Sequence, residues 1–280
     1  MAYLHSDREQ FRDAIDLAYE QTGVMVQAIE KDYYVTMLLR LLAQRMPYIV
    51  FKGGTSLSKC HKVIRRFSED IDITIDTLLS QGQKKKIKQA IVESAEELGM
   101  TIENLDETRS RRDYNRYVIA YDSVIPMASD ALKAAVLLET SYTAVSFPTV
   151  LLPVHSYIGD MMEQEAPDAI EEYNLNPFEM KVQGVDRTLA DKVFAVCDYY
   201  LQGKVAKHSR HLYDIYKLLP LVPQDENFKE LVKEVRAVRE QSVICPSALP
   251  EANVPELLEK IIKEKAYKQD YDSLTTQLLE

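Results

Sequence analysis

Two stretches that lie close together in the chain decide the fold. They are Phe51-Lys-Gly-Gly-Thr-Ser-Leu-Ser-Lys59 and Arg65-Arg-Phe-Ser-Glu-Asp-Ile-Asp-Ile73. The first is typical of a β-strand that meets a Gly-Gly turn and a helix, for which Thr55 is a suitable N-cap residue. The second runs into Asp70–Asp76, where polar and apolar residues alternate. This alternation predicts a strand with one apolar and one polar face.

The Gly-Gly turn places backbone amides beside a helix N-terminus, with no side chain to hold a phosphate away. We therefore expect Gly53 and Gly54 to bind a phosphate, although such a turn also occurs as a plain connection. The candidates for further phosphate contacts are Thr55, Ser56, Lys59, Arg66 and Ser68. For the two serines, the alternative is an ordinary role at a helix end or in a turn.

Two carboxylates follow on the predicted strand. Asp70 and Asp72 point to the same face, about 6–7 Å apart. Such a pair is costly unless a cation lies between its members. Mg²⁺ accepts oxygen ligands of this kind and usually retains water and substrate phosphates as further ligands; Mn²⁺ is the alternative. The strand could instead present a solvated face. Because Asp70 follows Gly54 by 70 − 54 = 16 residues, a helix and a return fit between them.

This combination resembles the DNA polymerase β-type nucleotidyltransferase superfamily, in which Gly-Gly/Ser is followed by Asp-x-Asp. More narrowly, it resembles the AbiEii/AbiGii toxin family. The matching text, besides the two stretches above, is Glu30-Lys-Asp-Tyr-Tyr34, Leu189-Ala-Asp-Lys192 and Arg210-His-Leu-Tyr-Asp214. These motifs extend over most of the chain, and no motif was matched after residue 219.

The resemblance implies transfer of a nucleoside monophosphate from a nucleoside triphosphate (NTP) to an acceptor, with pyrophosphate leaving. Asp70 and Asp72 would bind Mg²⁺, and Glu139, on a later strand, is the candidate third carboxylate; its alternative is an ordinary acid at a strand end. Lys192 would reach the triphosphate as a point charge, rather than extend to solvent from its helix. Asp214 would orient Lys192 or another basic group, unless it simply pairs with Lys217 three residues later.

The resemblance also implies a toxin with an antitoxin from the same operon, and an RNA acceptor such as a tRNA end. Three basic clusters could grip an RNA backbone, or could be solvated faces; they are Lys84–Lys88, Arg109–Arg116 and Lys204–His211. Tyr114 and Tyr117 could stack on a base or pack in the sheet. The competing hypotheses are a small-molecule or protein acceptor, and a module that binds nucleotide without turnover.

The expected fold is α+β. A polymerase β-type nucleotidyltransferase domain, a mixed sheet with flanking helices, is expected over residues 1–155. A mostly helical domain that carries Lys192 and Asp214 is expected over residues 156–280. The predicted helices are two within 7–45 separated at Gly23, then 55–66, 80–98, 188–201, 211–219, 226–243 and 255–267. The predicted strands are 48–51, 70–76, 101–105, 114–121, 133–141 and 179–182, with β-like composition fading around Pro148 and Pro153.

Composition limits the class of protein. The 280 residues include 34 Lys and Arg against 44 Asp and Glu, a net charge of −10. This acidity argues against a protein that coats nucleic acid through its overall field, but it permits local basic surfaces. No apolar run approaches the ~18–20 residues of a membrane helix, and the polar start lacks a signal-peptide core. With three widely spaced cysteines, we expect reduced thiols and a cytoplasmic protein.

Overall fold

The chain forms two compact units in the computed structural model, which describes residues 2–66, 68, 70–126 and 134–278. The sheet unit comprises Met1–Cys60 and Ser68–Val182, and the helical unit comprises His61–Phe67 and Gln183–Glu280. The α+β class is confirmed. The division falls after Val182 and not at the expected boundary after residue 155, because the strands between these two points pair into the sheet.

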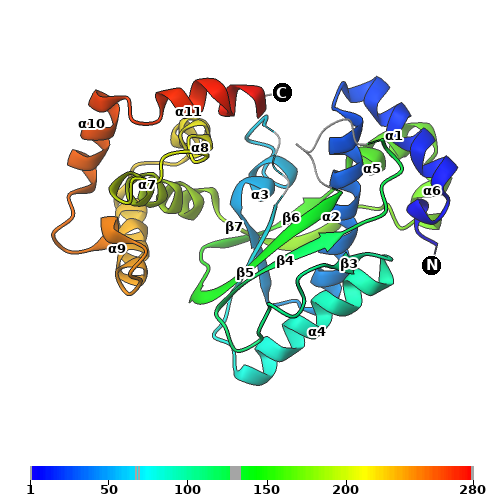
Figure 1. The fold of residues 1–280 in the computed structure, drawn as a ribbon, viewed down its shortest axis with the longest axis horizontal. Coiled ribbons are helices and arrows are strands. Elements are labelled where there is room, and N and C mark those ends of the chain that lie inside the picture. The colour runs from blue at the N-terminus through cyan, green and yellow to red at the C-terminus, as the bar shows by residue number, and fades with distance from the viewer. Residues whose placement is uncertain (1, 67, 69, 127–133, 279–280) are drawn as a thin grey trace. The chain divides into compact units, whose positions relative to one another are not determined.

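The sheet unit is built on a mixed seven-stranded sheet of order β3-β4-β5-β2-β1-β7-β6 (Figure 1). The strands are β1 (Ile49–Lys52), β2 (Ile71–Ile75), β3 (Thr101–Ile102), β4 (Tyr114–Ala120), β5 (Ala135–Val145), β6 (Thr149–Val154) and β7 (Phe178–Gln183). Strand β1 is antiparallel to β2 and parallel to β7. Strand β5 is parallel to β2 and antiparallel to β4, so β2 and β5 occupy the centre of the sheet.

Six helices of the sheet unit flank this sheet: α1 (Arg8–Thr22), α2 (Val26–Arg45), α3 (Gly53–Lys59), α4 (Gln81–Glu97), α5 (Tyr157–Glu165) and α6 (Pro167–Glu172). The predicted break at Gly23 is confirmed, since this residue ends α1 with a φ of 70°. Ser80 caps α4 in a reciprocal capping box with Gln83, as the polar start of that helix favours.

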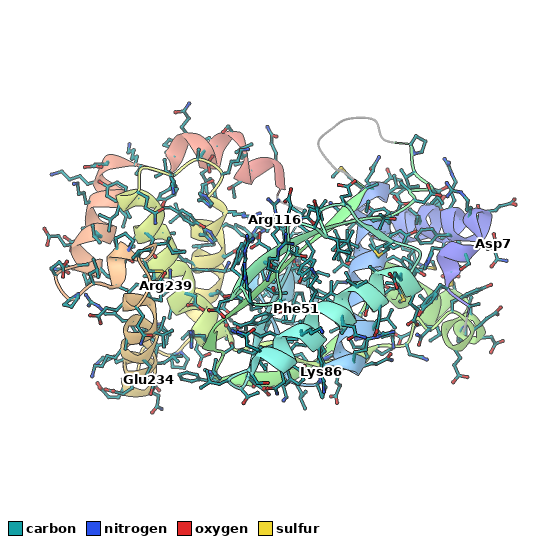
Figure 2. All side chains as sticks on the ribbon, turned by 60° about the horizontal axis from the view of Figure 1, so that its bottom comes forward. Asp7, Phe51, Lys86, Arg116, Glu234 and Arg239 are labelled. Atoms are coloured by element: carbon teal, nitrogen blue, oxygen red, sulfur yellow. The ribbon has the colours of Figure 1, made fainter. Side chains whose placement is uncertain are left out.

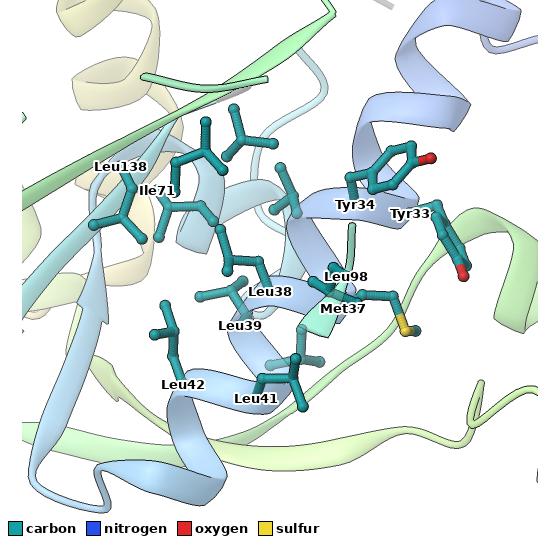
Figure 3. Close-up of a cluster of buried hydrophobic side chains, with 14 of the residues drawn as sticks. Tyr33, Tyr34, Met37, Leu38, Leu39, Leu41, Leu42, Ile71, Leu98 and Leu138 are labelled. Atoms are coloured by element: carbon teal, nitrogen blue, oxygen red, sulfur yellow. The ribbon is translucent and has the colours of Figure 1, made fainter. Parts of the chain in front are cut away.

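The largest core lies between α2, α4 and one face of the sheet. Helix α2 is apolar around most of its circumference, which suits a helix buried on several sides. Figure 3 shows Leu38, Leu39 and Leu42 of α2 directed toward Ile71 of β2 and Leu138 of β5. Ile71 and Leu138 are also partners across the parallel β2–β5 pair.

The register of β2 and β5 fixes what the opposite face of the sheet presents. Because successive side chains alternate between faces, the residues after Ile71 and Leu138 point away from α2. These residues are Asp72 and Glu139, which are themselves register partners. Arg116 of β4 is in turn the partner of Glu139, and Figure 2 shows Arg116 and Lys86 of α4 on opposite sides of the sheet. The face away from α2 and α4 is therefore polar.

The helical unit contains α7 (Val185–Leu201), α8 (Arg210–Leu218), α9 (Glu226–Glu240), α10 (Val254–Glu264) and α11 (Lys268–Ser273). Helix α7 is its central element and packs against α8, α9 and α10. Among its described residues, buried apolar side chains gather around Phe194 and Val235 and around Val196 and Ile261. All three cysteines of the chain are buried free thiols.

Three local predictions were wrong or incomplete. The helix expected over 55–66 spans only Gly53–Lys59, because residues 61–67 leave it to join the helical unit. The strand expected at 101–105 spans only Thr101–Ile102. Strand β6 forms where β-structure was expected to fade; it lies at the sheet edge, where a proline such as Pro153 is tolerated. Phe67, Glu69 and Lys133, which lie in predicted motifs or strands, are outside the described residues.

Candidate functional site

The turn at Gly53 packs directly against one of the predicted metal ligands. Lys52 is extended, and Gly53 has a φ of 80°, a conformation that favours glycine. A Cβ atom built on Gly53 would lie 1.9 Å from Asp72 Oδ2 and 2.8 Å from its Cγ. Glycine is therefore required here both by the backbone angle and by the close approach of Asp72. The structure therefore brings the turn and Asp72 together, and the part of Asp70 in this site stays a prediction.

The polar face of the sheet collects a row of functional groups across four adjacent strands. Lys52 of β1 is the register partner of Asp72 of β2, and Asp72 is the partner of Glu139 of β5. Arg116 Nε of β4 lies 3.7 Å from Glu139 Oε1, with both side chains partly exposed. Because cross-strand partners share a face, these four side chains lie on the same face of the sheet.

Tyr114 was not among the predicted site residues, yet it belongs to this row. It precedes Arg116 by two residues on β4 and therefore points to the same face. Burial, the Glu139 carboxylate that accepts a hydrogen bond from its hydroxyl, and the charge of Asp72 together raise the pKa of Tyr114 to about 12. Tyr117, by contrast, is buried in the core with 1% exposure, so it cannot stack on a base.

The predicted hydroxyl groups are placed differently from one another. Thr55 Oγ1 donates to Ser68 Oγ over 2.9 Å, which leaves the Ser68 hydroxyl hydrogen able to donate elsewhere. Ser56 is fully buried, and its Oγ donates to the Gly53 carbonyl over 2.9 Å. Its hydroxyl therefore closes the first turn of α3, the ordinary role at a helix end that was the alternative, and its role in binding phosphate stays a prediction.

Lys59 is buried inside the sheet unit, and its role in binding phosphate stays a prediction. Its ammonium group is buried and contacts Asp32 Oδ1 at 2.5 Å, Thr36 Oγ1 at 2.8 Å and the His155 carbonyl at 2.6 Å. Since an ammonium has three hydrogens, this set of acceptors uses all of them. Lys59 thus ties α3 to α2 and to the start of α5, where Asp32 also accepts from the Tyr157 amide.

Replacing Lys59 with methionine is expected to lower the free energy of unfolding by about 3 kcal/mol, because Asp32 loses its buried counter-charge. The affinity for nucleoside triphosphate should stay unchanged. If Lys59 instead bound a phosphate of the nucleotide, its replacement would lower that affinity. Urea unfolding and equilibrium nucleotide binding measure the two quantities. The control is Lys233→Met, which removes an exposed lysine paired with Glu230 and should cost less than about 1 kcal/mol. Weaker nucleotide binding in Lys59→Met alone would support the phosphate role.

The contact of Asp32 with Lys59 also explains part of the motif at residues 30–34. Glu30 is buried, and it accepts hydrogen bonds from Ser123 Oγ at 2.6 Å and from the Val124 amide at 2.7 Å. Burial raises the pKa of Glu30, although these hydrogen bonds oppose the shift. Glu30 and Asp32 thus connect α2 to neighbouring segments of the sheet unit and have a structural role.

The remaining predicted residues form an ion cluster within the helical unit. Arg66 donates to both oxygens of Asp214, from Nε to Oδ1 and from Nη2 to Oδ2, each at 2.7 Å. Lys192 of α7 donates to Asp214 Oδ2 of α8 at 2.6 Å. The expectation that Asp214 orients Lys192 agrees with this geometry. Lys217 was the alternative partner, but its ammonium lies over the rings of Tyr213 and Tyr216.

The charges of this cluster are strongly coupled. Burial alone would raise the pKa of Asp214, but Lys192 and Arg66 outweigh it and lower the pKa to about 2. Burial lowers the pKa of Lys192, and Asp214 opposes that change. Burial and the nearby Lys192 also hold the pKa of His211 well below 6.5. Arg66 is 2% exposed and donates to Asp214 through Nε and Nη2, and its role in binding phosphate stays a prediction.

The predicted site residues therefore fall into two groups. The sheet unit holds Gly53, Gly54, Thr55, Ser56, Lys59, Ser68, Asp70, Asp72 and Glu139, and the helical unit holds Arg66, Lys192 and Asp214. In the chain itself, Arg66 precedes Asp70 by only four residues.

The carboxylates suit a magnesium ion by their chemistry. Mg²⁺ selects carboxylate and phosphate oxygens, and a phosphate bound at the Gly53 turn would face the Asp72 carboxylate packed against it. Such a contact is repulsive without a cation. Among the side chains that the structure describes, no three acidic, histidine or cysteine groups are close enough to hold a metal together. To bind the cation, Glu139 would first have to release its ion pair with Arg116. Its role as third ligand stays a prediction.

A family model agrees with the motifs. A family model described as "Nucleotidyl transferase AbiEii toxin, Type IV TA system" matches residues 36–280. A search of curated proteins gave no match. Among solved structures, MenT4, a nucleotidyltransferase toxin from Mycobacterium tuberculosis H37Rv, is similar with a TM-score of 0.49 and 19% identity, over 81% of this chain and 70% of that chain.

The family model spans most of the chain and includes both stretches that decide the fold. In the part of the chain that the structure describes, no helix has both the length and the apolar composition that crossing a membrane requires. The chain belongs to the AbiEii nucleotidyltransferase toxin family of type IV toxin–antitoxin systems.

Proposed function

We propose that this nucleotidyltransferase toxin uses Mg²⁺ to transfer a nucleoside monophosphate from an NTP to the end of an RNA, such as a tRNA. The observation that carries the proposal is the contact between the Gly53 turn and Asp72, in register with Glu139. It brings a turn suited to phosphate and a row of acidic side chains to one face of one sheet.

Each group has a distinct role in this proposal. The amides of Gly53 and Gly54 hold the triphosphate, and the Ser68 hydroxyl donates a further hydrogen bond to it. Asp70 and Asp72 supply the carboxylates for Mg²⁺, which when bound neutralises the triphosphate and favours ionisation of the acceptor hydroxyl. Asp214 fixes the ammonium of Lys192 and the guanidinium of Arg66, so that their positive charge is held in one orientation.

An RNA acceptor is favoured by the cationic and aromatic side chains of β4. Tyr114 and Arg116 are about half exposed on the same face as the carboxylates. Arginine and an exposed aromatic ring are the combination that binds phosphodiesters and stacks on bases. The antitoxin is the partner that membership of a type IV system implies.

The test is transfer of label from each of the four α-³²P-labelled NTPs to total RNA, with Mg²⁺, with Mn²⁺ and with EDTA. We expect one or more NTPs to label RNA with either metal, and EDTA to reduce labelling to background. Nuclease treatment of the product separates RNA from other acceptors.

Two other outcomes would replace the proposal. Label that survives nuclease and migrates with protein or as a small molecule would assign a different acceptor. Tight NTP binding with neither label transfer nor pyrophosphate release would assign a nucleotide-binding module. Label transfer that persists in EDTA after the protein is stripped of metal would contradict the metal dependence.

A further inference from the structure

The order of strands divides the polar face into three zones. Lys52 and the Gly53 turn lie at β1, the carboxylates lie on β2 and β5, and Tyr114 and Arg116 lie on β4 beyond them. The three zones follow one another in a single row across the sheet. A group bound at β1 and a group bound at β4 would therefore meet over the carboxylates.

The chemistry of nucleotidyl transfer requires such an arrangement. The attacking oxygen and the leaving oxygen lie roughly in line through the phosphorus. If the triphosphate is held at the Gly53 turn, pyrophosphate leaves on the β1 side, and the acceptor must approach from the β4 side. The acceptor oxygen forms its bond to the α-phosphorus, the α–β bridging oxygen leaves with pyrophosphate, and the acceptor's proton passes to water.

The two side chains on β4 are presented by a rigid element. Between them, Asn115 is buried and holds the preceding loop: its Oδ1 accepts from the Arg109 amide at 2.8 Å and its Nδ2 donates to the Arg109 carbonyl at 3.1 Å. Tyr117 anchors the same strand in the core. Tyr114 and Arg116 thus project from a fixed strand, and binding there costs little ordering.

Both side chains have surface left to offer to a ligand. Tyr114 is 52% exposed, and the Arg116 side chain is 52% exposed. The Arg116–Glu139 ion pair is long, at 3.7 Å, and Glu139 is 35% exposed. Solvent therefore screens the pair, which contributes little to stability. A phosphate can therefore take over the guanidinium without a large loss.

We propose that Tyr114 and Arg116 form the acceptor subsite, in which Arg116 binds a phosphate near the RNA end and the ring of Tyr114 stacks on an adjacent base. The proposal rests on the proposed function, because it names the part of that site which binds the acceptor.

The test compares Arg116→Ala and Tyr114→Ala with controls of equal exposure on α1. Arg12 has 51% side-chain exposure and Tyr19 has 49% exposure, so Arg12→Ala and Tyr19→Ala remove the same groups elsewhere in the sheet unit. We expect the subsite variants to raise the KM for RNA about tenfold each, with the KM for NTP unchanged. Arg116→Ala should also reduce the slope of log affinity against log salt by about one.

Two further measurements keep the proposal falsifiable. Fluorescence anisotropy of a labelled tRNA, without NTP, measures acceptor binding independently of turnover. Tyr114→Phe retains the ring but loses the hydroxyl that contacts Glu139, so it should bind RNA as the wild type does. If Tyr114→Phe is as impaired as Tyr114→Ala, the stacking role is overturned.

The failure of each proposal is distinguishable. The acceptor subsite is overturned if the protein labels RNA but Arg116→Ala leaves the KM for RNA unchanged. It is also overturned if Arg12→Ala raises the KM for RNA as much as Arg116→Ala does. Either result leaves the proposed function intact. If the wild type labels no RNA, the RNA acceptor of the proposed function fails. Binding of tRNA that depends on Arg116 would then still support the subsite, and tRNA binding that is absent or insensitive to Arg116 would overturn it.

Discussion

Replacing Asp72 with asparagine is expected to lower the rate of nucleotidyl transfer on the order of 10³-fold without unfolding the protein. Asparagine has the same shape, so it fills the space against Gly53 that Asp72 occupies. It lacks the negative charge that Mg²⁺ requires and that the row of acidic groups supplies. Since the substitution also relieves repulsion between carboxylates, the free energy of unfolding should change by less than about 1 kcal/mol.

Initial rates with labelled NTP, at Mg²⁺ concentrations up to saturation of the wild type, measure this effect. Asp106→Asn is the control, because Asp106 is an exposed carboxylate of the sheet unit that no proposed role involves. Titration with Mn²⁺, followed by electron paramagnetic resonance, should show weaker metal binding in Asp72→Asn alone. A variant that keeps more than a tenth of the wild-type rate would remove Asp72 from the catalytic machinery.

Replacing Asp214 with asparagine is expected to have the largest effect on stability, a loss of about 3–5 kcal/mol in the free energy of unfolding. The side chain is 0% exposed, and it is the carboxylate to which both Arg66 and Lys192 donate. Its removal leaves two buried cations facing a neutral amide. Combining Asp214→Asn with Lys192→Met should cost less than the sum of the two single changes, since the lysine is then no longer stranded.

The same carboxylate predicts a pH dependence. Its pKa is lowered from 3.8 to about 2 in the folded protein. A lowered pKa stabilises the fold above the unfolded value, here by about 2 kcal/mol, and this contribution is lost as the pH falls from about 4 toward 2. The difference in unfolding free energy between wild type and Asp214→Asn should therefore shrink over that range.

Urea unfolding at a series of pH values tests this dependence. The control is Asp272→Asn, which breaks an exposed pair with Lys268 at 2.6 Å and should cost less than about 0.5 kcal/mol at any pH. An Asp214→Asn variant as stable as Asp272→Asn would contradict the buried ion cluster.

The features that local sequence determines were predicted correctly. The alternation in Asp70–Asp76 predicted the strand and the polar face that carries Asp72. The glycines predicted the turn, because Gly53 has to adopt a φ of 80° beside Asp72. Helices with clear apolar stripes and caps, such as α1 and α4, were placed to within a few residues.

Contacts between distant parts of the chain could not be predicted from the sequence. Lys59 has the charge expected of a phosphate ligand, but its ammonium group forms a buried ion pair with Asp32, 27 residues earlier. Arg66 likewise faces Asp214, which lies 148 residues later. No periodicity reveals that a charged side chain is buried, because its partner comes from another element. The end of α3 was missed for the same reason, since residues 61–67 follow contacts of the helical unit.

The role of Tyr114 could be predicted from the sequence only in part. Its position on a strand was predicted, and so was the alternative between stacking and packing. Alternation along β4 puts the two rings on opposite faces, but only the pairing of β4 with β5 shows that Tyr114 lies on the polar face and Tyr117 in the core.

The position of segment 61–67 in the chain affects which recombinants between related genes would be stable. It belongs to the helical unit, yet it is encoded between two elements of the sheet unit. Recombination between related genes that exchanged only the part encoding residues 183–280 would combine Arg66 of one parent with Asp214 and Lys192 of the other. A substitution tolerated in one parent at any of the three positions could then leave a buried charge unmatched in the hybrid. Selection should therefore keep these three residues linked, although most of the gene lies between them.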